Sequence, residues 1–385
     1  MKVKVQKEKF QPVKLSSERL ISLDAFRGIT IMGMILVNNP GSRSHVYPPL
    51  CHAEWHGCTF TDLIFPFFLF IVGVAMSFSF AKRVSHTGSN APLIKHIIRR
   101  TLILFALGLF LNWFPFFDIS HGRIPGVLQR IAVCYFFAAW IIMWLKPRTQ
   151  WIVTFFLLAI HWIGLTSIPV PGYGAGVLEA QGNLCGYIDS ILLKGHTWAH
   201  APAVGFDPEG IFSTLTALAT TMFGVFTGNW LRSDRGKESK LVGLFVAANV
   251  GMVIGYVLTI WMPLNKNMWT VSYVFFTAGL ALSFLAMCYW LIDLRHLHRI
   301  ATPFVIFGSN AIFVYVLSSA AAKLMYLIKL QSVTGEISLS SWLYQNLFKP
   351  WAGDMNGSLI FAITYVLIWL GVTYLLYRKK IFIKI

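Results

Sequence analysis

Long runs of apolar residues, separated by short polar stretches, dominate the sequence. Ten of these runs are about 20 residues long, the length that an α-helix needs to cross the hydrocarbon core of a bilayer. They cover about 21–39, 62–81, 96–115, 124–145, 150–168, 210–231, 241–262, 269–292, 302–326 and 357–377. The pattern predicts an all-α, polytopic integral membrane protein with about ten transmembrane helices.

The composition leaves little material for a soluble domain. Hydrophobic residues make up 56% of the 385 positions, charged residues 12%, and the mean hydropathy is +0.64. Soluble domains carry roughly a quarter charged residues. Because no internal repeat and no Ser- or Pro-rich linker divides the chain, we expect a single transmembrane domain over residues 1–385.

The formal net charge of +17 is typical of nucleic-acid-binding proteins, but the placement of the basic residues indicates another cause. If the ten spans alternate, 23 of the 32 Lys and Arg residues lie on the side of both termini, and six lie on the other side. Basic residues gather on the cytoplasmic side of membrane proteins. We therefore expect cytoplasmic termini, including a basic tail over 1–20, a lipid bilayer as partner, and no nucleic acid.

The long connections lie on the outer side of this arrangement, at 40–61, 169–209 and 327–356. They provide the material for an outer pocket. The Gly-rich loop 169–209 is typical of a lid over a sugar and equally of an ordinary exposed loop. Cys51, Cys58 and Cys185 lie on this side, where two of the three can pair.

Charged residues inside the spans are costly and are usually paired or functional. Asp24 and Arg27 are three residues apart and share a helix face, as a structural ion pair or as a site for an anion entering from the cytoplasm. Arg130, next to Gln129, has no acid nearby in sequence. It needs a carboxylate from another helix, a water-filled cavity or a ligand phosphate, which a planar guanidinium binds well.

The segment from Cys51 to Asp62 contains many side chains that can bind metals, transfer protons or act as nucleophiles. It offers every kind of metal ligand, but the spacing matches neither HExxH nor a zinc finger, so we expect no metal site; these residues are Cys51, His52, Glu54, His56 and Cys58. A histidine oriented by Glu54 or Asp62 is a suitable proton acceptor near neutral pH. Asn38 ends the first span on the same side, where its amide can stabilise an oxyanion. Helix capping by Thr61 or Asp62 is the alternative, and it leaves His52 and His56 unexplained.

Three further clusters are weaker signals when taken alone. The FDPEG segment holds Asp207 and Glu209 and has the composition of a helix start. The NKNMWT segment offers Asn265, Lys266 and Trp269 to a sugar, although Trp269 also suits a membrane interface. In the ninth span, Ser309 and Asn310 are polar residues of the kind that bond across helices.

Six ordered motifs resemble the heparan-α-glucosaminide N-acetyltransferase family and its bacterial, NagX-like relatives. They are RLISLDAFRGITIMGMILVNNPG, CHAEWHGCTFTDLIFPFFLFIVGVAMS, RIPGVLQRIAVCYF, FDPEGIFSTL, NKNMWTVSYVFFTAGLAL and PFVIFGSNAIFVYV. The resemblance extends from about Arg19 to Tyr377. LDAFRG alone is shared with a wider superfamily of membrane acyltransferases, so the order of all six motifs makes the resemblance specific.

The resemblance implies an enzyme that transfers the acetyl group of cytoplasmic acetyl-CoA to the amine of a terminal glucosamine on the other side. It assigns His52 as the active histidine and Asn38 as its partner, and we add Asp62 as its orienting carboxylate. Residues expected to contact the coenzyme are Arg27, Gln129, Arg130 and Asn310. Residues expected to contact the sugar are Glu54, His56, Asp207, Glu209, Asn265, Lys266 and Trp269.

The sequence also departs from the lysosomal member of that family. It lacks a large luminal N-terminal domain and an extra leading span, and it has His56 where that member has asparagine. These departures favour a bacterial inner-membrane enzyme. The family also suggests a homodimer.

Two other classes of function stay open at this stage. A sugar or drug transporter also has many spans, buried charges and an outer vestibule, although its inverted repeats are not visible here. An O-acyltransferase acting on envelope polysaccharide differs only in its acceptor. In the acetyltransferase, His52 is either a general base in direct transfer or a nucleophile that carries the acetyl group; we favour direct transfer, because water would hydrolyse an exposed acetyl-imidazole.

Overall fold

A computed structural model describes residues 20–87, 91–332 and 335–383, without the side chains of 82–87. The cytoplasmic tail expected at 1–20 falls outside this part, except for Leu20. The membrane-length helices are α1 (Ile21–Asn38), α2 (Phe60–Thr87), α3 (Ala91–Trp113), α4 (Val127–Trp144), α5 (Pro147–Ser167), α7 (Ile211–Arg232), α8 (Lys237–Leu258), α9 (Val271–Cys288) and α13 (Lys349–Arg378). Shorter elements are η1 (Pro48–Leu50), α6 (Leu184–Leu192), η2 (Tyr289–Leu294), α10 (His298–Ser309), α11 (Ala311–Leu327), β1 (Lys329–Ser332), β2 (Gly335–Ser338), α12 (Leu339–Leu343) and η3 (Tyr344–Phe348).

The all-α membrane architecture is confirmed. Each of the ten apolar runs coincides with a long helix or, for the ninth run, with a helix pair. Within the described part, eight helices are long and apolar enough to cross a membrane, and the bent pair raises the number to nine. The remaining helix, α3, has Lys95, Arg99 and Arg100 in its first half.

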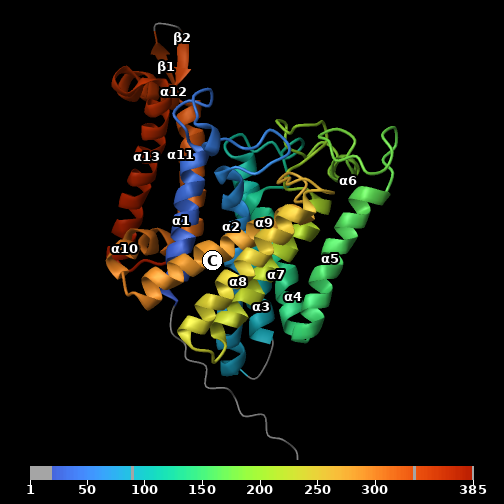
Figure 1. Ribbon diagram of the computed structural model, residues 1–385. Coiled ribbons are helices and arrows are strands. Elements are labelled where there is room, and N and C mark those ends of the chain that lie inside the picture. Colours follow the sequence, from blue (N-terminus) through green and yellow to red (C-terminus); the bar gives the residue numbers. More distant parts are fainter. Residues whose placement is uncertain (1–19, 88–90, 333–334, 384–385) are drawn as a thin grey trace, which may run out of the picture.

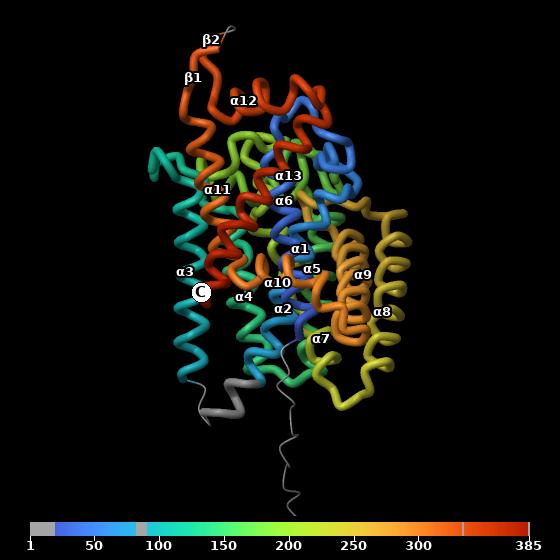
Figure 2. Tube along the Cα trace, turned by 90° about the vertical axis from the view of Figure 1, so that its left-hand side faces the viewer, coloured from blue at the N-terminus to red at the C-terminus, as the bar shows by residue number. Residues whose placement is uncertain are grey.

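The helices α2 and α7 form the centre of the bundle, whereas α8 and α13 lie at its periphery (Figures 1 and 2). Glycines allow the two central backbones to approach each other. A Cβ atom on Gly73 would lie 1.9 Å from the carbonyl oxygen of Thr221, and one on Gly224 would lie 2.0 Å from that of Phe70. Small residues at helix contacts are the usual means of packing in a membrane, where apolar burial between helices gives little driving force.

The ninth span is not the continuous helix that the sequence predicts. The helices α10 and α11 meet at Asn310 with a bend of 70°. The Asn310 side chain donates to the Ile381 carbonyl at 3.1 Å and accepts from the Ile383 amide at 2.8 Å. Asn310, at the break, therefore binds the C-terminal segment. The hydrogen bonds that we expected it to make to another helix are made instead to this non-helical segment.

The connections at one end of the bundle form a continuous layer, seen at the top of Figure 1, which we call the loop face. It consists of residues 39–59, 114–126, 168–210, 259–270, 328–332 and 335–348. It includes α6 and the hairpin of β1 and β2, which pair antiparallel from Lys329–Ser338 to Ser332–Gly335. Bonds between the loops include Gly57 N to Leu264 O at 2.7 Å and Ile124 N to His196 O at 2.9 Å.

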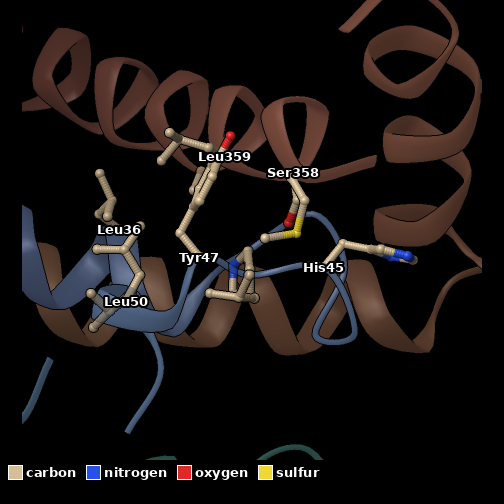
Figure 3. A pocket seen from close by; sticks show the side chains of 11 residues that line it. Leu36, His45, Tyr47, Leu50, Ser358 and Leu359 are labelled. Carbon is tan, nitrogen blue, oxygen red and sulfur yellow. The ribbon is translucent and has the colours of Figure 1, made fainter. Parts of the chain in front are cut away.

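Two narrow crevices border this layer. One lies between residues 36–50 and α13; its lining is mainly apolar, and the His45 ring is turned away from Leu36, Tyr47 and Leu50 (Figure 3). The other lies inside the bundle between α1, α2, α4 and α11. Its lining residues are almost all apolar: Ile31, Met34, Phe68, Val127, Leu128, Ile131, Ile312 and Tyr315.

Candidate active site

His52 and Asp62 form a close pair at the loop face. The Nδ1 atom of His52 lies 2.7 Å from Oδ1 of Asp62. The Asp62 side chain is almost fully buried, whereas 53% of the His52 side chain is exposed. The carboxylate therefore holds the inner ring nitrogen, and the rest of the ring faces the solvent side. Of the two acids expected to orient this histidine, Asp62 does so.

The second oxygen of Asp62 fixes the loop that carries His52. Oδ2 accepts hydrogen bonds from Ala53 N at 3.0 Å, Thr59 N at 3.1 Å and Thr59 Oγ1 at 3.1 Å. The Thr59 hydroxyl also lies 2.6 Å from the Cys51 carbonyl oxygen. The helix α2 begins at Phe60, so Thr61 and Asp62 lie inside its first turn and neither is the expected N-cap. Asp62 instead bonds back to Thr59 N while it orients His52, because one carboxylate has enough acceptor sites for both.

Lys266 completes the group from the loop between α8 and α9. Its Nζ atom lies 3.1 Å from His52 Nδ1 and 3.6 Å from Asp62 Oδ1. Burial lowers the pKa of Lys266 below its ordinary value, and the carboxylates of Asp62 and Glu209 act in the opposite direction. The lysine that we expected at the sugar is therefore in contact with the His52–Asp62 pair.

His56 and Asn265 join the His52 loop to the Lys266 loop. The Asn265 side chain donates to the Trp55 carbonyl at 2.9 Å, lies 3.3 Å from His56 Nδ1, and accepts from Met268 N at 2.8 Å. Asn265 is fully buried, and His56 Nε2 lies 3.7 Å from the exposed Glu179 carboxylate. Asn265 therefore holds the two loops together. Of these two side chains, only that of His56 is exposed enough to contact a sugar.

Asp207 and Glu209 both bind Arg123. Arg123 makes two hydrogen bonds to the fully buried Asp207 carboxylate, at 2.6 and 2.8 Å, and pairs with Glu209 through Nη2. Asp207 also accepts from the Trp198 and Glu209 amides, at 2.9 Å each. Burial raises the pKa of Glu209, but Arg123 outweighs this effect and holds it below its usual range. Both acids are thus committed to an internal ion cluster beside the site.

Arg130 lies within the wall behind this cluster. Its Nη2 donates to Gly210 O at 3.0 Å and to Ser213 Oγ at 2.5 Å, and its guanidinium lies 5.2 Å from the centre of the Trp269 ring. Its Nε and Nη1 have no hydrogen-bond partner among the described residues. Trp269 is 1% exposed and donates to Thr220 at 3.1 Å, so it is an internal residue and does not lie at a membrane interface.

The remaining coenzyme candidates are distributed along the bundle. Arg27 pairs with Asp24 at 3.2 Å in the second turn of α1, at the end opposite to the loop face. Gln129 is buried and donates to Ile124 O at 2.9 Å, and Asn310 binds the C-terminal segment. Arg27 and Arg130 therefore lie toward opposite ends, so they cannot hold the same part of one elongated ligand.

Asn38 and Glu54 are exposed at the loop face. Asn38 ends α1, and neither side chain makes a hydrogen bond to His52 in the described part of the chain. Cys51, Cys58 and Cys185 are free thiols, and burial raises the pKa of Cys58 to about 12. Across the described residues, no group of three or more His, Cys, Asp or Glu side chains has the arrangement of a metal site.

Comparison with known proteins supports the resemblance seen in the motifs. Residues 19–178 match the family model described as heparan-alpha-glucosaminide N-acetyltransferase, catalytic. The human heparan-alpha-glucosaminide N-acetyltransferase is 29% identical over 431 residues, which cover 95% of this chain and 60% of the relative. The mouse protein of the same name is 29% identical over 429 residues, covering 96% and 61%.

The chain therefore spans about three fifths of the length of these curated relatives. The matched family region contains Asn38, His52, Asp62 and Arg130, whereas Lys266 lies outside it. Residues 19–178 are thus similar to the catalytic region of heparan-alpha-glucosaminide N-acetyltransferases, and the similarity to these curated relatives extends over almost the whole chain.

Proposed function

We propose that the protein is a transmembrane acetyltransferase that moves the acetyl group of acetyl-CoA to the amine of glucosamine or of a glucosamine-terminated saccharide. The His52–Asp62 pair at 2.7 Å carries this proposal. With its Nδ1 hydrogen donated to Asp62, the neutral imidazole keeps an electron pair on Nε2. An exposed base of this kind is what an amine needs to lose its proton during acyl transfer.

In the reaction that we favour, the sugar nitrogen attacks the thioester carbonyl carbon while His52 Nε2 takes a proton from that nitrogen. The carbon–sulfur bond then breaks, the thiolate leaves with the bonding electron pair, and the proton returns from His52 to the sulfur. Asp62 stabilises the imidazolium formed between these steps. Asn38 is our candidate for stabilising the oxyanion, and its exposed amide has no hydrogen-bond partner in the described residues to compete for that role.

A narrow crevice inside the bundle marks the path that we propose for the pantetheine arm of the donor, and it must widen to admit the arm. Its almost wholly apolar lining joins α1 and α11 to the start of α4, the helix that carries Arg130. We propose that Arg27 holds the anionic end of acetyl-CoA at the opposite end of the bundle. The Nε and Nη1 atoms of Arg130 are then available to an amide or thioester carbonyl, and Gln129 and Asn310 remain candidates along this path.

The proposed acceptor site is the surface around His52 Nε2, with Glu54 and His56 at its rim. Lys266 contacts His52 and Asp62, and Glu209 pairs with Arg123, so both lie behind the acceptor surface. The buried Asp207, Asn265 and Trp269 support the surrounding structure. The proposed location is the cytoplasmic membrane of a bacterium. Both termini then face the cytoplasm and the loop face lies outside, as the distribution of basic residues favours. A homodimer is part of the same proposal.

The test is an acetyl-transfer assay with purified protein, radiolabelled acetyl-CoA and glucosamine. We expect labelled N-acetylglucosamine, and we expect His52→Ala to lower the rate by about 10²- to 10⁴-fold, the range for loss of a general base. His45→Ala is the matched control, because His45 is another histidine of the loop face and lies against Ser42 at 3.2 Å. Full activity of His52→Ala would contradict the assignment.

The same assay separates the alternatives. An O-acetyl product is released by mild alkali, whereas an N-acetyl product is not. A transporter takes up the sugar without modifying it, and it usually has paired broken helices in corresponding halves. The described residues contain the bent pair of α10 with α11, and α13 is also interrupted near its start, at Gly353.

A further inference from the structure

Lys266 approaches the catalytic pair from a loop that is 214 residues away from His52 in sequence. The position of this loop is fixed by the same structure that carries His52. Leu264 O accepts from Gly57 N, and Asn265 bonds to the Trp55 carbonyl. Two hydrogen bonds between the loops, made by the two residues that precede the lysine, hold its ammonium group against the histidine.

The distances define which hydrogen bond His52 makes. Nδ1 is 2.7 Å from Asp62 and 3.1 Å from Lys266, so the shorter contact is with the carboxylate. A ring nitrogen that donates to Asp62 offers no electron pair to the lysine. The ammonium group is then attracted to Asp62 Oδ1 at 3.6 Å, and its positive charge opposes the addition of a second proton to the imidazole.

A contact with the amine of the acceptor is a poorer explanation for Lys266. The amine of glucosamine is itself cationic when protonated, and a lysine would repel it. The Lys266 side chain is only 18% exposed, and its Nζ is turned toward the histidine and the carboxylate. The observed contacts therefore lie on the inner side of His52 and not on the side where the acceptor binds.

We propose that Lys266 is a positioning residue of the acetyl transfer. Its charge keeps Asp62 ionised, so that the carboxylate can hold the ring hydrogen of His52 at Nδ1, and it opposes formation of the imidazolium, which leaves the electron pair on Nε2. This proposal rests on the proposed function, because it assigns a task within the same site.

The other titratable groups around the site are arranged consistently with this role. The thiol of Cys58 is neutral, because burial raises its pKa to about 12. Tyr273, from α9, donates its hydroxyl hydrogen to the Asp62 carbonyl at 2.5 Å. Glu209 interacts electrostatically with Lys266 but is paired with Arg123. Among the groups with described contacts to the His52 ring, Lys266 is thus the cation and Asp62 the anion.

The first experiment measures kcat/KM for acetyl transfer against pH in wild type, Lys266→Met and Lys266→Arg. Removing the charge makes protonation of His52 easier, so the acidic limb of the Lys266→Met profile moves upward by about one pH unit, the scale of one nearby charge in a partly exposed site. Lys266→Arg keeps the wild-type limb. An unchanged limb with a raised KM for the sugar would overturn the proposal in favour of a sugar contact.

The second experiment reads the protonation of His52 without requiring activity. Diethyl pyrocarbonate modifies neutral imidazoles, and the pH midpoint of His52 modification is followed by peptide mapping in the folded proteins, with Lys266→Gln as a second neutral variant. His121 is the internal reference, because its ring lies 3.6 Å from Asp118 and 81% of its side chain is exposed. We expect the His52 midpoint to rise in both neutral variants and the His121 midpoint to stay constant.

The two experiments separate the two proposals. Equal His52 midpoints in wild type and in both neutral variants would overturn the role of Lys266, even if the enzyme acetylates glucosamine. A shifted midpoint in a protein that transfers no acetyl group would support the effect of Lys266 on the protonation of His52 and overturn the proposed function.

Discussion

The Asp62 carboxylate and the Arg130 guanidinium are both almost fully buried, at 1% and 2% exposure, but their surroundings differ. Both oxygens of Asp62 have partners: His52 and Lys266 on one side, Ala53 and Thr59 on the other. Arg130 uses one nitrogen for Gly210 and Ser213, and its other two nitrogens have no hydrogen-bond partner in the described residues.

The difference separates a group that is ready to act from one that still lacks a partner. A fully bonded carboxylate keeps its charge and orients its neighbours, which is the requirement for a fixed catalytic pair. A buried donor without a partner is costly and calls for a ligand or water. We therefore assign Asp62 to the organisation of the reaction and Arg130 to the binding of the donor molecule.

Replacing Asp62 by asparagine disrupts the His52–Asp62 pair and has the largest expected effect on activity. An amide NH₂ directed at His52 Nδ1 would move the ring hydrogen to Nε2 and remove the base. We expect kcat to fall by roughly 10³- to 10⁴-fold, as a wrong histidine tautomer does in other acyl transfers. Asp118→Asn, at the exposed His121–Asp118 pair, is the control and should retain full activity. A normal kcat in Asp62→Asn would contradict the account.

Replacing Arg130 by methionine tests the role of the buried guanidinium nitrogens that have no hydrogen-bond partner among the described residues. Loss of hydrogen bonds from a charged donor should weaken acetyl-CoA binding by about 10- to 100-fold while the sugar KM stays within a few-fold. Binding of labelled coenzyme in detergent is the readout. Ser213→Ala is the control, because it removes one internal partner and leaves Nε and Nη1 in place. Equal coenzyme affinity in Arg130→Met would remove this residue from the donor site.

Replacing His56 by asparagine sharpens the comparison by separating the two histidines of the loop. His56 contacts Asn265 and Glu179 and has no bond to Asp62, so activity should stay within a few-fold of wild type. The comparison of kcat for His56→Asn and His52→Ala decides between them. Inactivity of His56→Asn together with an active His52→Ala would show that the wrong histidine is assigned.

At the buried carboxylate of Asp189, the effect of burial on the pKa exceeds that of its hydrogen bonds. Replacing this residue is expected to have the smallest effect of the changes considered. It accepts from the Ile211 and Asp207 amides at 2.9 and 3.3 Å, but burial dominates and raises its pKa to about 6. The folded state therefore holds its proton more tightly than the unfolded state, so this group's contribution to stability falls as pH rises from about 4 to 6. The Tm of Asp189→Asn should decline less over this range than that of wild type, and an identical pH dependence would contradict the assignment.

Much of the fold follows from the sequence, because a membrane-spanning segment must satisfy its backbone hydrogen bonds within itself. Each apolar run therefore gave one long helix or, at the ninth, one helix pair. The break at Asn310 does not follow from local sequence, because its partners Ile381 and Ile383 lie more than 70 residues away. The hairpin of β1 and β2 and the helix α6 were also not expected within the loops.

Only part of the candidate site can be predicted from the sequence. Asp62 was a natural partner for His52, because the two are ten residues apart on a loop that leads into a helix. The sequence predicts a sugar contact for Lys266, whereas in the structure it contacts His52 and Asp62. Nothing in NKNMWT indicates that this loop packs against Trp55 and Gly57. The ion cluster of Arg123 with Asp207 and Glu209 shows the same limit, since Arg123 is more than 80 residues from either acid in sequence.

The measurement that tests the central claim most directly uses sealed proteoliposomes, labelled acetyl-CoA and an impermeant saccharide with a terminal glucosamine. With the two substrates on opposite sides of the membrane, we predict labelled product, and none with His52→Ala. With both substrates only outside, we predict no product for either orientation of the protein. Product from substrates that share one side would contradict transfer across the bundle to His52.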